Sequence, residues 1–285
     1  MSLRILLVRH GLSSFNLEHR IQGRDDLSSL TEEGVKQGLA TGEALRDLPI
    51  TAAYSSPLRR AHDTATALLA AQGGGLEPNL DDDLLEVDLA PWSGLLSSEV
   101  QERFPEAYRT WKQHPEQLEL QRADGSTYAP IPELMAQARR FVDRLLAQHN
   151  PTSPTPQTVL VVGHNAILRC LILCLLGLPL TGFRRLRVDN CSISVLNLAP
   201  GADGGTAVQV ESLNGVVDKL TDRGARVIRI NATENADIPL HTSESELLAP
   251  VVDILPAQLL AYHLTVTRGL DPDQPNGLSK VTITR

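Results

Sequence analysis

The sequence has few of the residues that cross-link a protein. Only three of its 285 residues are cysteines, at positions 170, 174 and 191. Three are too few for a disulfide framework, and their spacing does not fit a zinc site. Cys170 and Cys174 lie within one apolar stretch, which predicts reduced thiols in a core. We therefore expect a protein of the reducing cytoplasm.

Long apolar runs and an excess of basic charge are lacking as well. The longest apolar stretch, residues 170–176, is far shorter than a membrane span, and the run at 5–8 is too short for a signal peptide. The net charge of −8 argues against partners that need a basic field, which are nucleic acids and anionic membranes. A few arginines can still reverse the potential locally for a small anionic substrate.

The sequence does have enough apolar residues, 42%, for a substantial core. Its length allows one large α/β domain with an appendage, or two ordinary domains. Short apolar strands alternate with segments of helical periodicity, which predicts a layered α/β fold. The helix expected at 166–176 is apolar on every side, as a buried helix is. Strands are expected at 5–8, 52–55, 158–162, 192–198 and 207–213, and helices at 31–45, 57–72, 99–111, 133–148 and 166–176.

Polar residues follow three of these strands directly. Arg9 and His10 follow the first strand, residues 55–60 follow the second, and Gly163 and His164 follow the third. In α/β folds of this kind the reactive residues lie at the carboxyl ends of the strands. We therefore expect these residues to form one site.

The residue types at these positions suit the transfer of a phosphoryl group. Such a group carries charge on three oxygens and needs several preorganised donors. An imidazole nitrogen can attack phosphorus and hold it as a phosphohistidine, while a carboxyl group protonates the leaving alcohol and later deprotonates water. Because arginines stabilise the charge, no metal or other cofactor is required. The candidates are His10 as nucleophile, Arg9, Arg60 and His164 as cations, Asn16 and Gln22–Gly23 as donors, and Glu86 as the carboxyl group.

Five motifs in order over residues 1–215 resemble those of the histidine phosphatase superfamily, also called phosphoglycerate mutase-like. They read LVRHGLSSFN, RIQGRDDLSSLTEEG, YSSPLRRAHDTA, LLEVDLAPWSG and VVGHNA. The resemblance implies a three-layer α/β/α sandwich with a mostly parallel sheet. It also implies that His10 is phosphorylated, that Glu86 donates and accepts the proton, that Arg9, Arg60 and His164 bind the phosphoryl group, and that Asn16, Ser13, Gln22, Gly23 and Asn165 assist in binding substrate.

The motifs depart from the family pattern at two places. The usual RHGET reads RHGLS, and FGxWEG reads LAPWSG, which predicts a pocket rim unlike that of the glycolytic mutases. The insertions of those mutases are not obvious, which favours hydrolysis over mutation. The chain looks most like the 2-carboxy-D-arabinitol-1-phosphatase type, and the likeness points to carbohydrate metabolism and to a phosphorylated sugar acid or a similar small metabolite as substrate.

Several assignments have alternatives. A phosphoglycerate mutase that uses 2,3-bisphosphoglycerate and a non-catalytic module that binds phosphorylated ligands are the rival functions. Arg59 competes with Arg60, and Asp88 and the run 81–83 compete with Glu86. We interpret residues 81–83 as a solvated acidic loop, and Trp92 and Trp111 as packing residues.

The character of the sequence changes after residue 215. Residues 216–285 resemble the end of the sugar isomerase domain of glucosamine-6-phosphate synthase, in LLAYHLTVTRGLDPDQPNGLSKVT above all. Lys280 matches a lysine of the isomerase site, but the other site residues have no counterpart, so no isomerase activity is expected. We predict a domain at 1–215 followed by a short strand–helix fragment. The apolar face of such a fragment predicts loose order, packing on the first domain, or self-association, for example as a homodimer.

Overall fold

The computed structural model describes residues 3–201, 205–216, 230–231 and 238–239. The chain forms two compact units, residues 1–222 and 223–285. Within the second unit, β9 (Ile230–Asn231) pairs in parallel with β10 (Ile238–Pro239). The other calls on the tail, Lys280 among them, lie outside the described residues. The boundary at 215 therefore stays a prediction, and the account below concerns the first unit.

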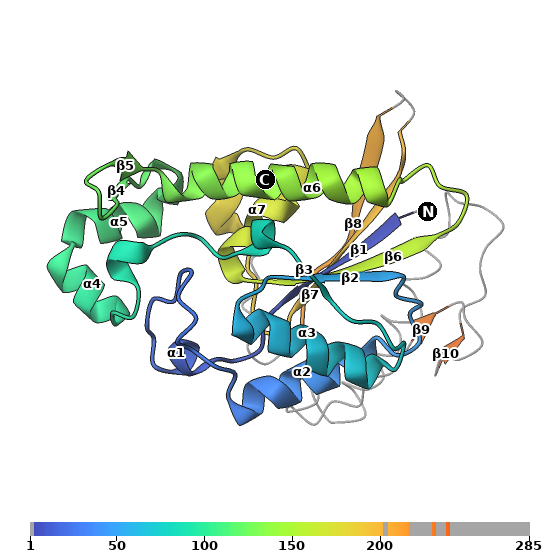
Figure 1. The fold of residues 1–285 in the computed structure, drawn as a ribbon. Helices are drawn as coiled ribbons and strands as arrows, with labels where there is room; N and C mark the ends of the chain where they lie inside the picture. Colours follow the sequence, from blue (N-terminus) through green and yellow to red (C-terminus); the bar gives the residue numbers. More distant parts are fainter. Residues whose placement is uncertain (1–2, 202–204, 217–229, 232–237, 240–285) are drawn as a thin grey trace, which may run out of the picture. The chain divides into compact units, whose positions relative to one another are not determined.

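A six-stranded sheet forms the centre of the first unit (Figure 1). Its strands are β1 (Leu3–Arg9), β2 (Ala52–Ser55), β3 (Asn79–Leu80), β6 (Gln157–Gly163), β7 (Ile193–Pro200) and β8 (Thr206–Gly215). Their order across the sheet is β3-β2-β6-β1-β7-β8. The first four are parallel, whereas β7 is antiparallel to β1 and to β8. The sheet is therefore mixed and mostly parallel, as predicted.

Helices cover both faces of this sheet (Figure 1). Helices α2 (Glu32–Ala44) and α3 (Arg59–Gln72) lie on one face, and α6 (Pro130–Gln148) and α7 (Asn165–Leu175) on the other. The three layers that the family resemblance implies are confirmed. Loops between them carry α1 (Ser14–Leu17), α4 (Ser97–Arg103), α5 (Pro105–Gln113), the hairpin of β4 (Leu120–Gln121) and β5 (Thr127–Tyr128), and four 3₁₀ turns at Asp82–Leu84, Ala90–Trp92, Pro115–Gln117 and Leu180–Arg185.

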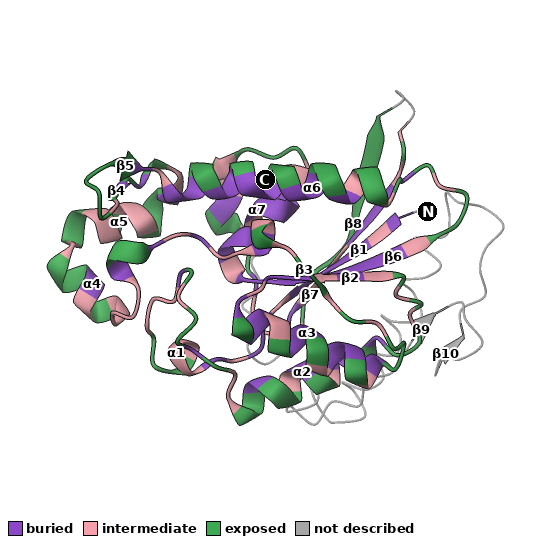
Figure 2. Ribbon diagram, viewed as in Figure 1, coloured by how far each residue is buried: buried purple, intermediate pink, exposed green. Residues whose placement is uncertain are grey.

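The middle parts of β1 and β6, residues 5–8 and 159–162, are wholly apolar because both of their faces are covered. Ile5 and Leu7 of β1 pack in the core under α6 and α7, while Leu6 and Val8 pack in the core under α2 and α3. Figure 2 shows β1 and β6 buried between the two helical layers. No helix among the described residues is long and apolar enough to cross a membrane.

Helix α2 approaches the loop after β1 very closely. Thr31 begins the helix by accepting a hydrogen bond from the Gly34 amide, and it also donates to the Leu12 carbonyl. A Cβ on Gly34 would lie 2.1 Å from the Leu12 oxygen, and one on Gly11 would lie 2.3 Å from the Gly34 oxygen. Both positions therefore need glycine, and the glycine that follows His10 is explained by backbone packing.

Three expected helices differ in their ends. The helix expected at 99–111 is split into α4 and α5, because Pro105 has no amide hydrogen and Phe104 before it is not helical. Pro130 begins α6, three residues earlier than expected, and α3 begins at Arg59 instead of in the turn of Pro57. The other expected elements agree within two residues.

The close approach of α2 predicts opposite effects for two alanine substitutions one turn apart. Gly34→Ala should lower the free energy of unfolding by about 2 kcal/mol or more, since backbone must move to admit the methyl group. Gly38→Ala is the matched control, because its Cβ would meet nothing closer than 3.5 Å. There the higher helix propensity of alanine should raise the free energy of unfolding by about 0.5–1 kcal/mol. Urea denaturation measures both, and equal effects would contradict this packing.

Candidate active site

The parallel pairing of β1 with β6 brings two histidines together. Arg9 is in register with Gly163, so His10 and His164 follow side by side, with 5.2 Å between their ring centroids. The His10 amide donates to the Gly163 carbonyl at 2.9 Å, so the backbone hydrogen bonds between the two strands continue as far as His10. Both side chains are buried.

The hydrogen bonds of His10 define its tautomer. Its Nδ1 lies 2.8 Å from the Gly11 carbonyl oxygen, which can only accept, so Nδ1 carries the proton and Nε2 carries the lone pair. Burial lowers the pKa of His10 well below its usual value, and the charges of Arg9 and Arg60 lower it further. The ring is therefore neutral, and its Nε2 has a free lone pair at neutral pH.

His164 has the same electrostatic surroundings. Its pKa is also well below the usual value, because of burial first and then of the nearby Arg60, His10 and Arg9. Its Nε2 lies 2.8 Å from the Ser56 hydroxyl. When that hydroxyl donates, Nδ1 carries the proton, and Nδ1 has no hydrogen-bond partner within the described protein.

Two arginines are held by backbone carbonyls. Arg60 is fully buried and donates to the carbonyls of Gly23 and Asp25, each at 2.8 Å. Arg9 donates to the Val188 carbonyl at 2.8 Å, and burial lowers its pKa to about 10. Both groups therefore stay charged at neutral pH. Arg59, the competitor of Arg60, is exposed.

The polar side chains of the early loop are oriented by one another. Ser13 is buried and donates to the side-chain oxygens of Asn16 and Gln22, at 3.0 and 3.1 Å. Asn190 also donates to the Asn16 oxygen at 3.2 Å, and to the His10 carbonyl at 2.9 Å. These bonds leave the amide nitrogens of Asn16 and Gln22 available to a ligand. Ser13 therefore positions its neighbours and does not itself line the pocket.

The carboxyl group of Glu86 lies against the N-terminus of α7. Its carboxylate accepts hydrogen bonds from the backbone amides of Val87, Ala166 and Ile167, at 2.9–3.2 Å. These hydrogen bonds fix the orientation of the carboxyl group at the N-terminus of the helix. Asp88 is instead paired with Arg122 and faces away into another pocket.

The segment before Glu86 is tied to α6 by ion pairs. Asp83 is bonded by Arg140 and Arg144, and Asp81 by Arg144, at 2.6–2.9 Å. Although burial alone would raise the pKa of Asp83, the hydrogen bonds from the two arginines lower it. The interpretation of residues 81–83 as a solvated acidic loop is therefore wrong for Asp81 and Asp83.

These side chains surround a pocket of about 190 Å³. Its lining includes eight of the ten predicted site residues; Ser13 and His164 lie behind it. Across the described residues, six buried side-chain polar atoms have no hydrogen-bond partner, and four of them belong to Arg9, Arg60, His164 and Arg169. Unpaired buried donors are rare in native proteins. Arg9, Arg60 and Arg169 line this pocket, and His164 packs beside His10, so these donors favour the binding of an anion there. The predicted lining residues are Arg9, His10, Asn16, Gln22, Gly23, Arg60, Glu86 and Asn165.

Sequence reasoning missed part of this pocket. Arg169 of α7 lines it, so this helix is not apolar on every side as expected. The signal was present, because Arg169 is the one charged residue in an apolar stretch and lies four positions after Asn165. Trp111 packs against Trp92 as predicted, with 6.4 Å between centroids, but it lines the pocket too. Arg20, Phe183 and Arg184 also line the pocket, and no sequence pattern placed them there.

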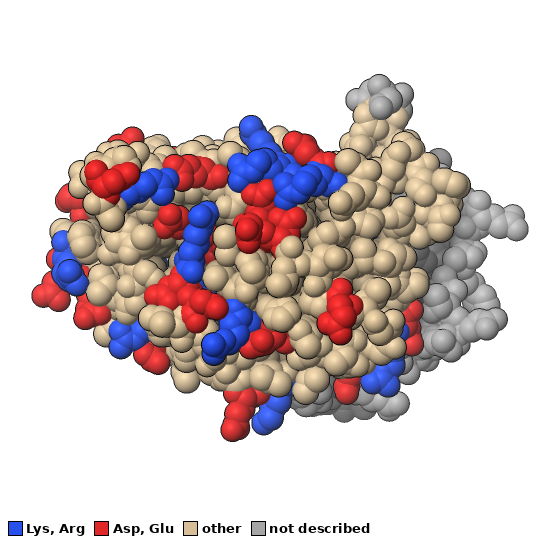
Figure 3. Space-filling view, viewed as in Figure 1, with Lys and Arg blue, Asp and Glu red and all other residues tan. Residues whose placement is uncertain are grey.

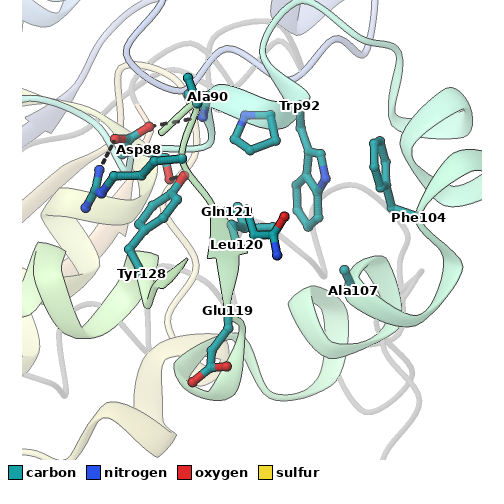
Figure 4. Close-up of a pocket in the computed structure, with 12 residues that line it drawn as sticks. Asp88, Ala90, Trp92, Phe104, Ala107, Glu119, Leu120, Gln121 and Tyr128 are labelled. Carbon is teal, nitrogen blue, oxygen red and sulfur yellow. Dashed lines mark hydrogen bonds and ion pairs between the residues drawn. The ribbon is translucent and has the colours of Figure 1, made fainter. Parts of the chain in front are cut away.

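A larger pocket of about 840 Å³ lies near the β4–β5 hairpin (Figure 4). Trp92, Phe104 and Ala107 form one side, and Tyr128 and Asp88 the other. It contains none of the predicted site residues, and its charged residues include the ion pair of Asp88 with Arg122, so the smaller pocket is the candidate site. On the face in Figure 3, acidic and basic side chains are interspersed without a large patch of one sign.

Comparisons with known proteins agree with this geometry. A family model of the histidine phosphatase superfamily (branch 1) matches residues 5–210. The chain is 37% identical over 203 residues to a probable 2-carboxy-D-arabinitol-1-phosphatase of Arabidopsis thaliana. This match covers 71% of this chain but only 39% of that protein. It is 34% identical over 196 residues to phosphoserine phosphatase 1 of Hydrogenobacter thermophilus, covering 69% and 87% of the two chains.

The structure also resembles a mycobacterial glucosyl-3-phosphoglycerate phosphatase solved with VO3. The TM-score is 0.63 at 27% identity, and the match covers 74% of this chain and 98% of that one. The family model and the curated relatives thus show the family, and the structural match shows the fold.

The buried neutral histidines predict a pH-dependent stability. Below about pH 6.5 the unfolded chain protonates its histidines, whereas His10 and His164 stay neutral in the folded protein because their pKa values are depressed. The unfolded state then binds more protons, so the free energy of unfolding should fall from pH 7 to pH 5, by at most about 1.4 kcal/mol per pH unit for each histidine.

Urea denaturation of wild type and His10→Gln at pH 7, 6 and 5 measures this effect. The fall should be smaller in His10→Gln, and His62→Gln is the control that removes an imidazole outside the pocket. A fall as large in His10→Gln as in wild type would contradict the assignment.

Proposed function

The chain belongs to the histidine phosphatase superfamily, and from that premise we propose that it is a phosphatase that hydrolyses a small phosphomonoester through a phosphohistidine at His10. One observation carries the proposal. Arg9 and Arg60, which have unpaired buried donors, line one pocket with His10, whose Nε2 bears a lone pair, and His164 lies beside its ring. A phosphoryl group needs donors for its oxygens and a nucleophile for its phosphorus, and this pocket offers both.

The first step transfers the phosphoryl group to the protein. The Nε2 lone pair of His10 forms the bond to phosphorus while the bond from phosphorus to the ester oxygen breaks. Glu86 in its protonated form gives its proton to that oxygen, so an alcohol leaves. Arg9 and Arg60 stabilise the charge on the phosphoryl oxygens, and their fixing by backbone carbonyls means that they need not reorganise.

The second step releases phosphate. Glu86, now a carboxylate, takes a proton from water, and the water oxygen forms the new bond to phosphorus. The bond from phosphorus to Nε2 breaks, and its electron pair returns to His10. Protein side chains supply every charge and proton in this cycle, which is why we propose that it needs no metal.

The names of the relatives guide the choice of substrate. One is a probable 2-carboxy-D-arabinitol-1-phosphatase, another a phosphoserine phosphatase and the structural match a glucosyl-3-phosphoglycerate phosphatase. Substrates of this kind are phosphomonoesters that also bear a carboxylate. We propose a phosphorylated sugar acid or a similar metabolite of the cytoplasm.

Phosphate release from a panel of substrates tests the function. We expect release from one or more of 2-carboxyarabinitol 1-phosphate, phosphoserine, 3-phosphoglycerate and 4-nitrophenyl phosphate, in the presence of EDTA. His10→Ala should abolish it. In kcat/KM, which reports the steps up to departure of the alcohol, Glu86→Gln should slow alkyl phosphates by about 100-fold or more, and 4-nitrophenyl phosphate by less, because a nitrophenolate leaves without a proton.

Two results would contradict the proposal. Isomerisation of 3-phosphoglycerate without net phosphate release would mean a mutase. Binding of phosphorylated ligands without any turnover would mean a non-catalytic module. Asp88→Asn is the matched control for Glu86→Gln, since this nearby carboxylate lines the other pocket.

A further inference from the structure

We propose that Arg169 binds a second anionic group of the substrate, a carboxylate, beside the phosphoryl group. The inference rests on the proposed function, because it concerns the other end of the same substrate. Arg169 lies in α7, four residues after Asn165 and on the same face of the helix. Both residues line the pocket. Arg169 is therefore in contact with the space that the substrate occupies.

The guanidinium of Arg169 is desolvated without a matching anion. Its Nε is buried and has no hydrogen-bond partner. In the part of the chain that the structure describes, no carboxylate lies within ion-pair distance of it. A half-buried cation with an unpaired buried donor is costly unless a ligand completes it.

Aromatic rings hold this arginine and its neighbour in place. The guanidinium of Arg169 lies 5.1 Å from the ring centroid of Phe183. At the exposed rim, Arg184 lies over Trp111 at 4.7 Å. Stacking on a ring restricts a guanidinium but leaves its edge free to bind the two oxygens of a carboxylate. This wall is thus preorganised for a planar anion.

The charges in the pocket support a second anionic group. Arg9 and Arg60 already match the two negative charges of a phosphomonoester. The carboxylate of Glu86 is satisfied by backbone amides, although its charge also acts on Arg169. Arg169 is thus a third guanidinium in the pocket beyond what the phosphoryl group requires, and a carboxylate suits its paired donors.

Matched substrates that differ only in a carboxylate test this role. Phosphoserine is compared with phosphoethanolamine, and 3-phosphoglycerate with glycerol 3-phosphate. The quantity measured is kcat/KM of the carboxylate-bearing member divided by kcat/KM of the other member. A loss of activity that both members share cancels in this ratio. In Arg169→Gln the ratio should fall by about 10- to 100-fold, mainly through KM of the carboxylate-bearing member. In Arg169→Lys, which keeps the charge, the ratio should fall by less. Arg185→Gln is the control for the loss of an exposed arginine nearby.

The outcomes separate this inference from the proposed function. An unchanged ratio in Arg169→Gln, or a wild type that prefers neither member, overturns the role of Arg169 while phosphate release still supports a phosphatase. An equal loss on both members, with a shifted pH profile, would mean that Arg169 only balances Glu86. If no phosphomonoester is hydrolysed, 4-nitrophenyl phosphate included, the proposed function itself fails.

Binding to a His10→Ala protein tests the same claim without turnover. Isothermal titration calorimetry should show tighter binding of 3-phosphoglycerate than of glycerol 3-phosphate. Adding Arg169→Gln should remove about 10-fold or more of that difference. Equal affinities for the two ligands before that substitution would overturn the inference.

Discussion

The pairing of β1 with β6 is the constraint on which the site depends. Because the two parallel strands are in register at Arg9 and Gly163, the residues that follow them meet at one edge of the sheet. The strands are apolar on both faces and are covered by helices, so this register is fixed by burial. A slip by one residue would move His10 away from His164 and turn Ile5 and Leu7 to the wrong core.

Burial of the site has a second consequence, which is electrostatic. His10 and the neighbouring His164 stay neutral beside a small pocket that is lined by several arginines and one carboxyl group. The folded protein thus bears the cost of removing these donors from water before any ligand binds. That arrangement is typical of sites that stabilise charge in a transition state, since the donors need not reorganise when the charge develops.

Much of this could be predicted from the sequence, because local signals and ordered motifs carried it. The short apolar runs predicted the central strands, and the polar residues after them predicted where the site lies. Side chains brought in by loops could not be predicted so. Phe183 and Arg184 reach the pocket, and Asn190 reaches His10 and Asn16, through turns whose path depends on tertiary packing. The apolar majority of α7 hides the polar position of Arg169. The break at Phe104 follows from Pro105, which an apolar periodicity does not register.

The central claim is that His10 carries the phosphoryl group during turnover. Rapid mixing with a reactive substrate, a quench in base and mapping of the modified residue by mass spectrometry test it most directly. The account predicts a phosphoryl group on His10, formed within a single turnover and absent from His10→Ala. Substrate turnover without any phosphorylated protein, or with the group on another residue, would contradict it.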